Sequence, residues 1–170
     1  MRLARENEFD RIFAIMEQSF PRDEYRSRAG QRAIWADARY RVYVEEAGEE
    51  ICAFISVWQL EGIVFAEHFA VDAKYRGRGL GAEMLTKLQS LCIDPICLEV
   101  ELPETEIARR RIAFYERNGF FYNDYPYEQP AFSKEQSPVP LRIMTTASPL
   151  NPSEFNALKK IIYKEIYCRN

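Results

Sequence analysis

The sequence predicts an α+β domain with helices on both sides of a mixed, mostly antiparallel sheet of about seven strands, an α/β/α layered arrangement. Three strand patterns follow one another between residues 39 and 71, with tight turns between them. The third leads into a glycine-rich segment that begins a helix, and further strand and helix patterns alternate after it. At 170 residues the chain has the length of one domain with its own core.

Composition narrows the class of protein. The net charge is -3 at pH 7, which disfavours a nucleic-acid-binding surface. The 4 cysteines form no C-x-x-C pair and lack histidines at metal-ligand spacing, so we expect free thiols in a reducing compartment and no metal site. The N-terminal residues are charged where a signal peptide is apolar, and no run approaches the roughly 20 apolar residues of a membrane span. We therefore expect a cytoplasmic protein without membrane or nucleic-acid partners.

The first half of the chain is predicted to place two helical segments before the meander of strands. A short strand over residues 2–5 precedes a helix that begins near Asn7 and ends before Pro21, because proline disfavours helical geometry in the residue before it. The charged segment 21–38 is expected to form a shorter and less regular helix. Antiparallel strands are then expected over residues 39–47, 50–60 and 63–71.

Helices and strands alternate in the second half. The expected elements are a helix over residues 80–92, a strand over 96–102, a helix over 104–118, and strands over 120–124 and 141–146. Segment 125–140 holds four prolines with aromatic residues between them, which predicts a packed loop rather than a regular element. Pro152 begins a final amphipathic helix. We expect a main domain over residues 1–146 and a helical extension over 147–170, packed on the domain or on the second subunit of a homodimer.

The stretch 67–88, EHFAVDAKYRGRGLGAEMLTKL, combines a strand end, a tight turn and a helix start. The first main-chain N–H groups of a helix have no partner within it and carry the positive end of its dipole, so they suit an anion. Gly77, Gly79 and Gly81 lack Cβ atoms, which lets a ligand approach the main chain and lets the turn take unusual dihedral angles. The run lacks the Lys-Ser/Thr ending of a nucleoside-triphosphate loop and follows a meander, so a mononucleotide or dinucleotide site is disfavoured.

With its surroundings, this stretch resembles the acetyl-CoA-binding motif of the GCN5-related N-acetyltransferase (GNAT) superfamily. The matching segments are FAEHFAVD, YRGRGLGAEML, CLEVE and RRIAFYERNGF, in that order, and the order of elements along residues 1–146 agrees with that family's mixed sheet. The resemblance implies an enzyme that transfers acetyl from acetyl-CoA to a primary amine by direct attack in a ternary complex, without a metal or a covalent intermediate.

The resemblance also implies which residues bind acetyl-CoA. Main-chain N–H groups of the glycine run bind its pyrophosphate, while the end of the preceding strand binds the pantetheine arm and presents the thioester. The residues implied are Phe69, Ala70, Val71, Arg76, Gly77, Arg78, Gly79, Leu80 and Gly81. Many family members have an asparagine in the pattern N-x-x-A-x-x-x-Y, where this chain has Ala108, so an asparagine contact to the cofactor is not expected here.

Two residues are expected to move protons. The resemblance places Tyr115 near the thioester sulfur, as the donor to the leaving thiolate, and the alternative is a core tyrosine on an amphipathic helix. Glu67 is our choice of base, because alternation along the strand puts it on the same face as Phe69. The alternative for Glu67 is an ion pair with a nearby arginine. Glu99 and Glu101 are reserve candidates for the base or for binding a cationic substrate.

Other polar residues near these segments have more ordinary interpretations. Alternation puts His68 on the opposite face from Glu67, as a buried histidine with its polar atoms satisfied. Arg109, Arg110 and Arg111 are consecutive and spread around a helix, so solvated positions are expected, with one of them a candidate for a CoA phosphate.

The sequence does not identify the acceptor. A small-molecule or peptide amine is expected between segment 21–38 and the loop after Asp124. Two other classes stay open: an acyl-CoA-binding sensor without transfer activity, and a nucleotide-binding protein. Release of free thiol from acetyl-CoA with a panel of amines distinguishes an enzyme from a sensor.

Overall fold

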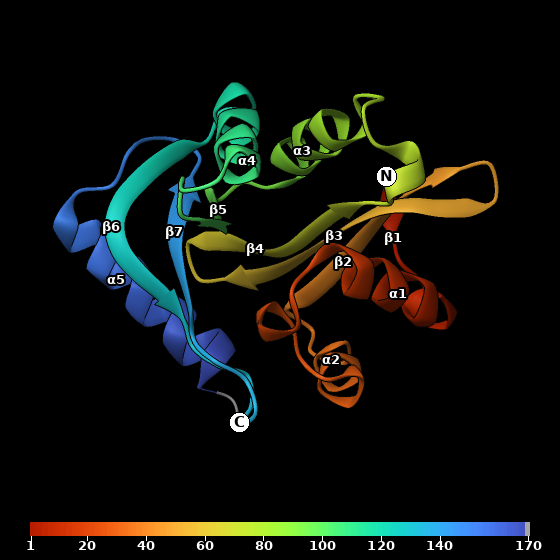
Figure 1. Cartoon of the computed structure of the whole chain (residues 1–170), viewed down its shortest axis with the longest axis horizontal. Coiled ribbons are helices and arrows are strands. Elements are labelled where there is room, and N and C mark those ends of the chain that lie inside the picture. Colours follow the sequence, from red (N-terminus) through yellow and green to blue (C-terminus); the bar gives the residue numbers. More distant parts are fainter. Residues whose placement is uncertain (169–170) are drawn as a thin grey trace.

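A seven-stranded sheet forms the centre of the molecule in a computed structural model that describes residues 1–168 (Figure 1). The strands are β1 (Arg2–Leu3), β2 (Tyr40–Ala47), β3 (Glu50–Leu60), β4 (Ile63–Val71), β5 (Ile96–Glu101), β6 (Phe121–Gln129) and β7 (Val139–Thr145). Their order is β1-β2-β3-β4-β5-β7-β6, and every neighbouring pair is antiparallel except β4 and β5. The mixed, mostly antiparallel sheet predicted from the sequence is therefore confirmed.

Helices cover both faces of this sheet. They are α1 (Phe9–Ser19), α2 (Arg28–Ile34), α3 (Leu80–Leu91), α4 (Glu106–Arg117) and α5 (Pro152–Ile162), with short helical turns η1 (Glu6–Glu8), η2 (Arg22–Glu24), η3 (Ala73–Tyr75) and η4 (Tyr163–Tyr167). One apolar core lies between the sheet and α1 and α5, and a second lies between the sheet and α3 and α4. The α/β/α layers expected from the sequence are present, and none of the helices within residues 1–168 has the length and apolarity to cross a membrane.

Local sequence explains where the helices begin and end. α1 ends at Ser19, two residues before Pro21, as predicted. The Thr105 side chain accepts a hydrogen bond from the main-chain N–H of Ala108 at the start of α4. Asn151 caps α5 in the same way, and Pro152 occupies the first helical position, where its missing N–H costs nothing.

The parallel pair β4 and β5 is joined over only three residue pairs, Val64–Ile96, Phe65–Cys97 and Ala66–Leu98. Beyond them, β4 continues to Val71 against β3, and β5 continues to Glu101 against β7. The inner edges of the two strands therefore have no strand partner after this point, and the sheet opens between them.

The predicted packed loop over 125–140 is wrong in part, because β6 runs on to Gln129. Pro126 has no N–H to donate, but it lies where the pairing between β6 and β7 shifts register, between Asn123 and Tyr127. β6 is also an edge strand, so its other side needs no partner. A proline is tolerated in a strand under these two conditions, and the connecting loop shrinks to residues 130–138.

Asn123 stabilises this irregular part of the sheet. Its side chain is 3% exposed; its Nδ2 donates to the carbonyl of Ile143 at 3.2 Å and to Thr145 Oγ1 at 3.1 Å. Its Oδ1 accepts from the main-chain N–H of Leu150 at 2.8 Å, which ties the segment leading to α5 to the sheet.

We expect Asn123→Ala to lower the free energy of unfolding by about 2 kcal/mol, because it leaves buried polar groups without partners. Urea denaturation measures this change. Asn156→Ala, at an exposed position of α5, is the matched control and should change stability by less than about 0.5 kcal/mol. Equal effects of the two substitutions would contradict the role given to Asn123.

Candidate active site

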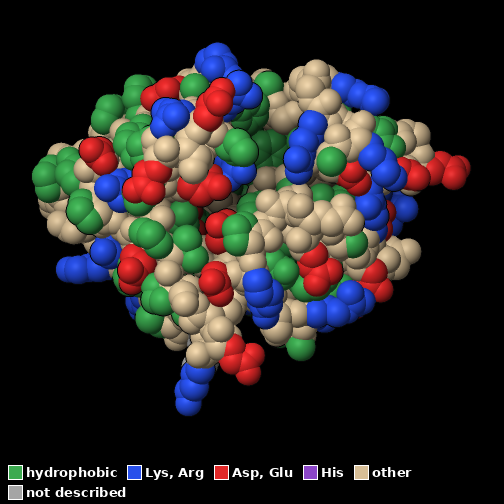
Figure 2. Space-filling model, in the orientation of Figure 1, with side chains coloured by type: hydrophobic (Ala, Val, Ile, Leu, Met, Phe, Trp, Pro, Cys, Tyr) green, Lys and Arg blue, Asp and Glu red, His purple; other side chains and the backbone are tan. Residues whose placement is uncertain are grey.

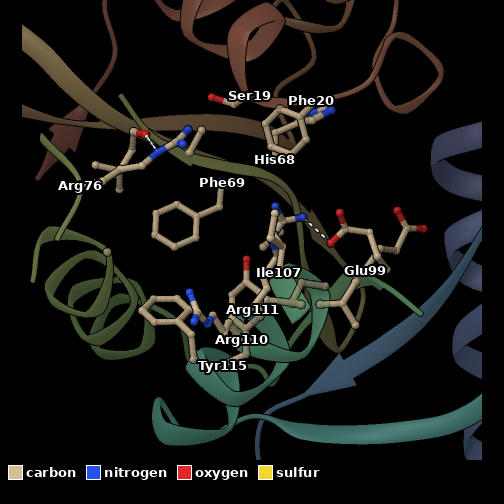
Figure 3. A pocket seen from close by; sticks show the side chains of 18 of the residues that line it. Ser19, Phe20, His68, Phe69, Arg76, Glu99, Ile107, Arg110, Arg111 and Tyr115 are labelled. Carbon is tan, nitrogen blue, oxygen red and sulfur yellow. Dashed lines mark hydrogen bonds and ion pairs between the residues drawn. The ribbon is translucent and has the colours of Figure 1, made fainter. Parts of the chain in front are cut away.

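A cavity of about 700 Å³ lies where β4 and β5 separate (Figure 3). On one side of the sheet it is lined by the glycine run and by α4, and on the other by the end of α1, by η2 and by β6. The cavity therefore reaches both faces of the sheet. Its lining includes Tyr115, Glu99 and Glu101, and of the residues predicted to bind the cofactor it includes Phe69, Ala70, Val71, Arg76, Gly77, Gly79, Leu80 and Gly81.

Arg78 is the predicted cofactor residue that does not line this cavity. Its guanidinium donates to the carbonyl of Lys74 at 3.2 Å and lies 5.4 Å from the ring centre of Tyr75. The side chain thus packs along the turn that precedes α3.

The glycine run joins the end of β4 to α3 through two left-handed residues. Gly77 has φ 76° and Gly79 has φ 81°, values that side chains with a Cβ rarely adopt. Gly79 is the N-cap of α3, and no atom lies within 4 Å of where a Cβ would stand at either glycine. There is thus open space beside both glycines at the start of α3, where the phosphate cradle is predicted.

Gly81 has a different role from the one predicted. It lies within α3, and a Cβ there would stand 3.2 Å from the Phe114 ring and 3.6 Å from the Phe69 ring. Glycine at this position lets α3 approach α4 and β4 closely, rather than letting a ligand approach the main chain.

An ion pair holds the turn between β4 and the glycine run. Asp72 Oδ2 lies 2.6 Å from Arg11 Nη2, and Asp72 Oδ1 accepts from the main-chain N–H of Lys74 at 3.0 Å. The hydrogen bond from Arg11 holds the pKa of the Asp72 carboxyl below its usual range. Arg76 Nε donates to the carbonyl of Val71 at 2.9 Å, as Figure 3 shows.

Tyr115 enters the cavity from α4 and is 7% exposed. Its ring makes edge contacts with the rings of Phe114 and Phe120, so its position is fixed by packing. Burial raises the pKa of its hydroxyl to about 12, which keeps the proton on the oxygen at neutral pH. The side chain can therefore donate a proton or a hydrogen bond into the cavity.

Glu67 does not lie on the same face of β4 as Phe69, contrary to the prediction. Ser56 pairs with His68 while Val57 pairs with Ala66, so Glu67 is the extra residue of a β-bulge and strict alternation fails there. Phe69 packs toward α3 and α4.

The carboxylate of Glu67 is turned to the opposite layer. Its Oε1 lies 2.6 Å from Arg26 Nη1, and its side chain is 2% exposed. The ion pair weighed as the alternative for Glu67 is therefore present, and the carboxylate is shut off from the cavity that its main chain lines.

His68 lies beside Glu67 rather than opposite to it, and its Nδ1 is 3.6 Å from Glu67 Oε2. Its Nε2 makes a hydrogen bond with the carbonyl of Glu24 at 3.0 Å, and its ring meets Phe20 edge-on. Burial lowers the pKa of His68, so the imidazole is neutral at pH 7. The predicted opposite faces are wrong, and so is the prediction that the polar atoms of His68 are satisfied, because Nδ1 is buried without a hydrogen-bond partner within residues 1–168. The prediction that His68 is buried is confirmed.

Glu99 enters the cavity from β5 and is held by two hydroxyl groups. Tyr167 Oη lies 3.0 Å from Oε1 and 2.9 Å from Oε2 of Glu99, and Tyr127 Oη donates to Oε1. Burial raises the pKa of Glu99 to about 7, and the nearby carboxylates of Glu67 and Glu24 add to the rise. Burial likewise raises the pKa of Glu24 to about 7, with a further contribution from Glu101. These are the carboxyl groups of the cavity that titrate near neutral pH.

The arginines at the start of α4 serve different purposes. Arg109 donates to the main-chain carbonyls of Pro103 and Glu104, and Arg110 pairs with Glu106 on the helix surface. Arg111 pairs with Glu101 and, like Arg110, lines the cavity. Figure 2 shows Lys and Arg side chains along the upper edge, over α3 and α4, and acidic side chains nearer the middle of this face.

Sequence reasoning missed three residues of this cavity and its wall: Glu24, Tyr127 and Tyr167. Glu24 lies in a charged stretch in which no position stands out. Alternation along β6 would have identified Tyr127 had that segment been recognised as a strand. No signal in the sequence connects Tyr167 with Glu99, 68 residues away. Within residues 1–168, no group of three His, Cys, Asp or Glu side chains is placed to hold a metal ion.

Comparison with known proteins agrees with this geometry. Residues 38–121 match the family model described as an acetyltransferase (GNAT) domain. The chain belongs to the GNAT superfamily. The matched segment covers β2 to β5 and the glycine run of this GNAT fold, and it ends at the first residue of β6.

Three similar proteins illustrate the range of similarity. "Putative acetyltransferase YjbC" of Bacillus subtilis (strain 168) is 27% identical over 107 residues, which are 62% of this chain and 54% of that protein. The chain thus spans about half the length of this relative. A solved structure named "Putative acetyltransferase from GNAT family from Bacteroides thetaiotaomicron" has a TM-score of 0.90 and 24% identity, with 100% of both chains covered. Arabidopsis thaliana Naa50, in complex with the bisubstrate analogue CoA-Ac-MVNAL, has a TM-score of 0.63 and 19% identity, covering 85% of this chain and 95% of that one.

The raised pKa of Glu99 gives a prediction for stability against pH. The folded protein holds a proton on Glu99 up to about pH 7, whereas an unfolded chain releases it near the ordinary glutamate pKa of about 4.3, so this group lowers stability as pH rises between these values. We expect Glu99→Gln to become more stable relative to the parent by about 2 kcal/mol from pH 5 to pH 8.

Denaturation curves at several pH values measure this difference. Glu106→Gln, an exposed carboxylate on α4, is the control and should show no comparable change with pH. A constant difference between Glu99→Gln and the parent at every pH would contradict the account of Glu99.

Proposed function

We propose that this protein transfers the acetyl group of acetyl-CoA to a primary amine, of a small molecule or a peptide, by direct attack in a ternary complex. The observation that carries the proposal is the cavity that reaches both faces of the sheet between β4 and β5. It allows acetyl-CoA to bind on the side of α3 and α4 while the amine approaches from the side of α1, η2 and β6. A cytoplasmic location, inferred from the unpaired cysteines, is part of the same proposal.

Acetyl-CoA fits this site because main-chain groups at the start of α3 and along the inner edge of β4 have no partner in a helix or strand within residues 1–168. The N–H groups at the start of α3 would bind the pyrophosphate, with Gly77 and Gly79 leaving room for it. The free inner edge of β4 over residues 69–71 would form hydrogen bonds with the pantetheine arm, as an added strand does. Arg76, Gly77, Arg78, Gly79, Leu80 and Gly81 make up the pyrophosphate segment in this proposal. The bisubstrate analogue bound to Naa50, which contains CoA and a peptide, supports the use of this cosubstrate.

The acetyl transfer exchanges a C–S bond for a C–N bond and moves protons at the nitrogen, at the sulfur and at Tyr115. An ammonium group first loses a proton to a base, and its lone pair then forms the C–N bond with the thioester carbonyl. The C–S bond breaks, and Tyr115 donates its proton to the sulfur. The nitrogen loses its second proton, Tyr115 is reprotonated, and one proton in total is released per acetamide and CoA thiol formed. Holding the amine against the thioester supplies the largest part of the rate enhancement.

The base predicted from the sequence was Glu67. Its carboxylate faces Arg26 and is almost completely buried, which supports a structural role for this side chain. Glu99, one of the reserve candidates, has a carboxylate that reaches the cavity, and it is therefore the base that we favour.

Release of CoA thiol from acetyl-CoA tests the proposed function directly. A panel of 1,4-diaminobutane, glycinamide and an alanine-initiated tetrapeptide covers small and peptide amines. Amine-dependent thiol release, with the acetamide detected by mass spectrometry, is expected with at least one of them. Tight binding of acetyl-CoA without turnover on any amine would instead indicate a sensor.

Tyr115→Phe is expected to lower kcat about 100-fold, because the thiolate then leaves without a proton donor. The dissociation constant of acetyl-CoA should change less than about twofold, since the ring and its packing are kept. Tyr43→Phe on β2, outside the cavity, is the control. Unchanged kcat in Tyr115→Phe would remove this residue from the mechanism.

A further inference from the structure

We infer that Tyr127 and Tyr167 position the carboxylate of Glu99, the base proposed above, so that it can bind the ammonium group of the acceptor and accept its proton. The segment after α5 would then complete the acceptor site, although it lies outside the residues that match the family model. The inference rests on the proposed acetyl transfer and names the part of the cavity that recognises the amine.

Of the acidic residues that line the cavity, Glu99 and Glu24 have no salt bridge within residues 1–168. Glu67 is paired with Arg26, and Glu101 is paired with Arg111. Glu99 has no cationic partner within residues 1–168, and its hydrogen bonds come from two neutral hydroxyl groups. An ammonium group would supply the counterion that Glu99 lacks, which makes a cationic amine the chemical class of acceptor that fits.

Position along the sheet also favours Glu99. It follows Leu98, the last β5 residue paired with β4, so it is the first residue of β5 after the point where the two strands separate. Across the opening, the main chain of β4 runs on to Phe69, where the thioester would be presented. Glu24, the other carboxyl group that titrates near neutral pH, belongs to η2 rather than to β4 or β5, and its main-chain carbonyl makes a hydrogen bond with His68 of β4.

The two tyrosines leave Oε2 of Glu99 more available than Oε1 to accept a further hydrogen bond. Glu99 Oε1 accepts from both Tyr127 and Tyr167, whereas Oε2 accepts only from Tyr167 at 2.9 Å. Oε2 therefore keeps a lone pair for an ammonium proton. Burial and the Glu99 carboxylate raise the pKa of both tyrosines, so both remain donors while Glu99 titrates.

The position of Tyr167 depends on contacts from distant parts of the chain. Its ring centre lies 5.3 Å from that of Phe132, and the two rings are tilted relative to each other. The guanidinium of Arg26 lies 4.3 Å from the ring centre of Phe132. Arg26 also donates to the carbonyl of Ile166 at 3.3 Å. Because the same Arg26 is paired with Glu67, the bulge of β4 and the turn that carries Tyr167 are held by one side chain.

The groups that act on Glu99 come from several elements. Tyr127 approaches from β6 and Tyr167 from η4, and the Glu67 and Glu24 carboxylates act from β4 and η2. Cys97 is on the same strand, and burial and Glu99 keep its thiol protonated. The hydroxyl groups favour the charged carboxylate, while burial and the two carboxylates oppose it.

Kinetics of four variants test the inference, with the amine from the panel that the parent acetylates fastest. Glu99→Gln should lower kcat/KM for the amine at least 100-fold, while the dissociation constant of acetyl-CoA stays within twofold. Tyr127→Phe and Tyr167→Phe should each lower kcat/KM for the amine about 10-fold. Each should also move the acidic limb of the pH profile to higher pH, because losing a hydrogen-bond donor raises the pKa of Glu99. Activity of these two variants should recover as pH rises.

Tyr163→Phe is the matched control, since this residue lies on the same turn but its hydroxyl donates to the carbonyl of Glu128. It should keep the parent's pH profile and kcat/KM. If the parent acetylates an amine and Glu99→Gln does so equally well, the inference fails while the proposed function stands. The inference also fails if Tyr127→Phe and Tyr167→Phe behave like Tyr163→Phe. Absence of transfer by the parent with every amine would overturn both.

Discussion

The separation of β4 from β5 is the constraint on which the site depends. Parallel neighbours normally continue side by side, but here pairing stops after Ala66 and Leu98. Each strand keeps its hydrogen bonds on the outer side, β4 with β3 and β5 with β7, so the opening does not unravel the sheet. The inner edges are left with main-chain donors and acceptors that face a cavity rather than another strand. A ligand in the cavity can form hydrogen bonds with these main-chain groups, so the separation of the strands creates a candidate binding site.

Side chains from distant elements hold the two walls of this opening. On the β4 wall, Arg26 binds the bulged Glu67, and Arg11 binds Asp72 at the end of the strand. Removing one partner of a buried pair such as Arg26–Glu67 leaves an uncompensated charge, which is far costlier than losing an exposed pair. On the β5 wall, the hydroxyl groups of Tyr127 and Tyr167 are the only hydrogen-bond partners of the Glu99 carboxylate within residues 1–168.

Local patterns were sufficient to predict most elements and the glycine run. Turn residues marked the meander, and apolar spacing marked the helices, because both signals depend on neighbours a few residues away. The strand that continues through Pro126 was missed, because only its edge position and its register shift permit a proline there. Neither property can be recognised in the segment itself.

The site was predicted less completely for the same reason. Gly77 and Gly79 were predicted correctly as positions that need unusual dihedral angles, since that requirement is local. The faces of Glu67 and His68 were wrong because one extra residue in β4 shifts the alternation. Arg26 lies 41 residues from Glu67, and Tyr127 and Tyr167 lie 28 and 68 residues from Glu99. No periodic pattern encodes contacts at these separations.

The central claim is that one cavity through the sheet brings acetyl-CoA and the amine together from opposite faces. A crystal structure of the protein with CoA and an acetylatable amine tests it most directly. The account predicts the pyrophosphate at the main-chain N–H groups of residues 77–81, the pantetheine arm along the inner edge of β4, and the amine nitrogen beside Glu99. Both ligands on the same face of the sheet, or CoA bound away from the opening between β4 and β5, would contradict it.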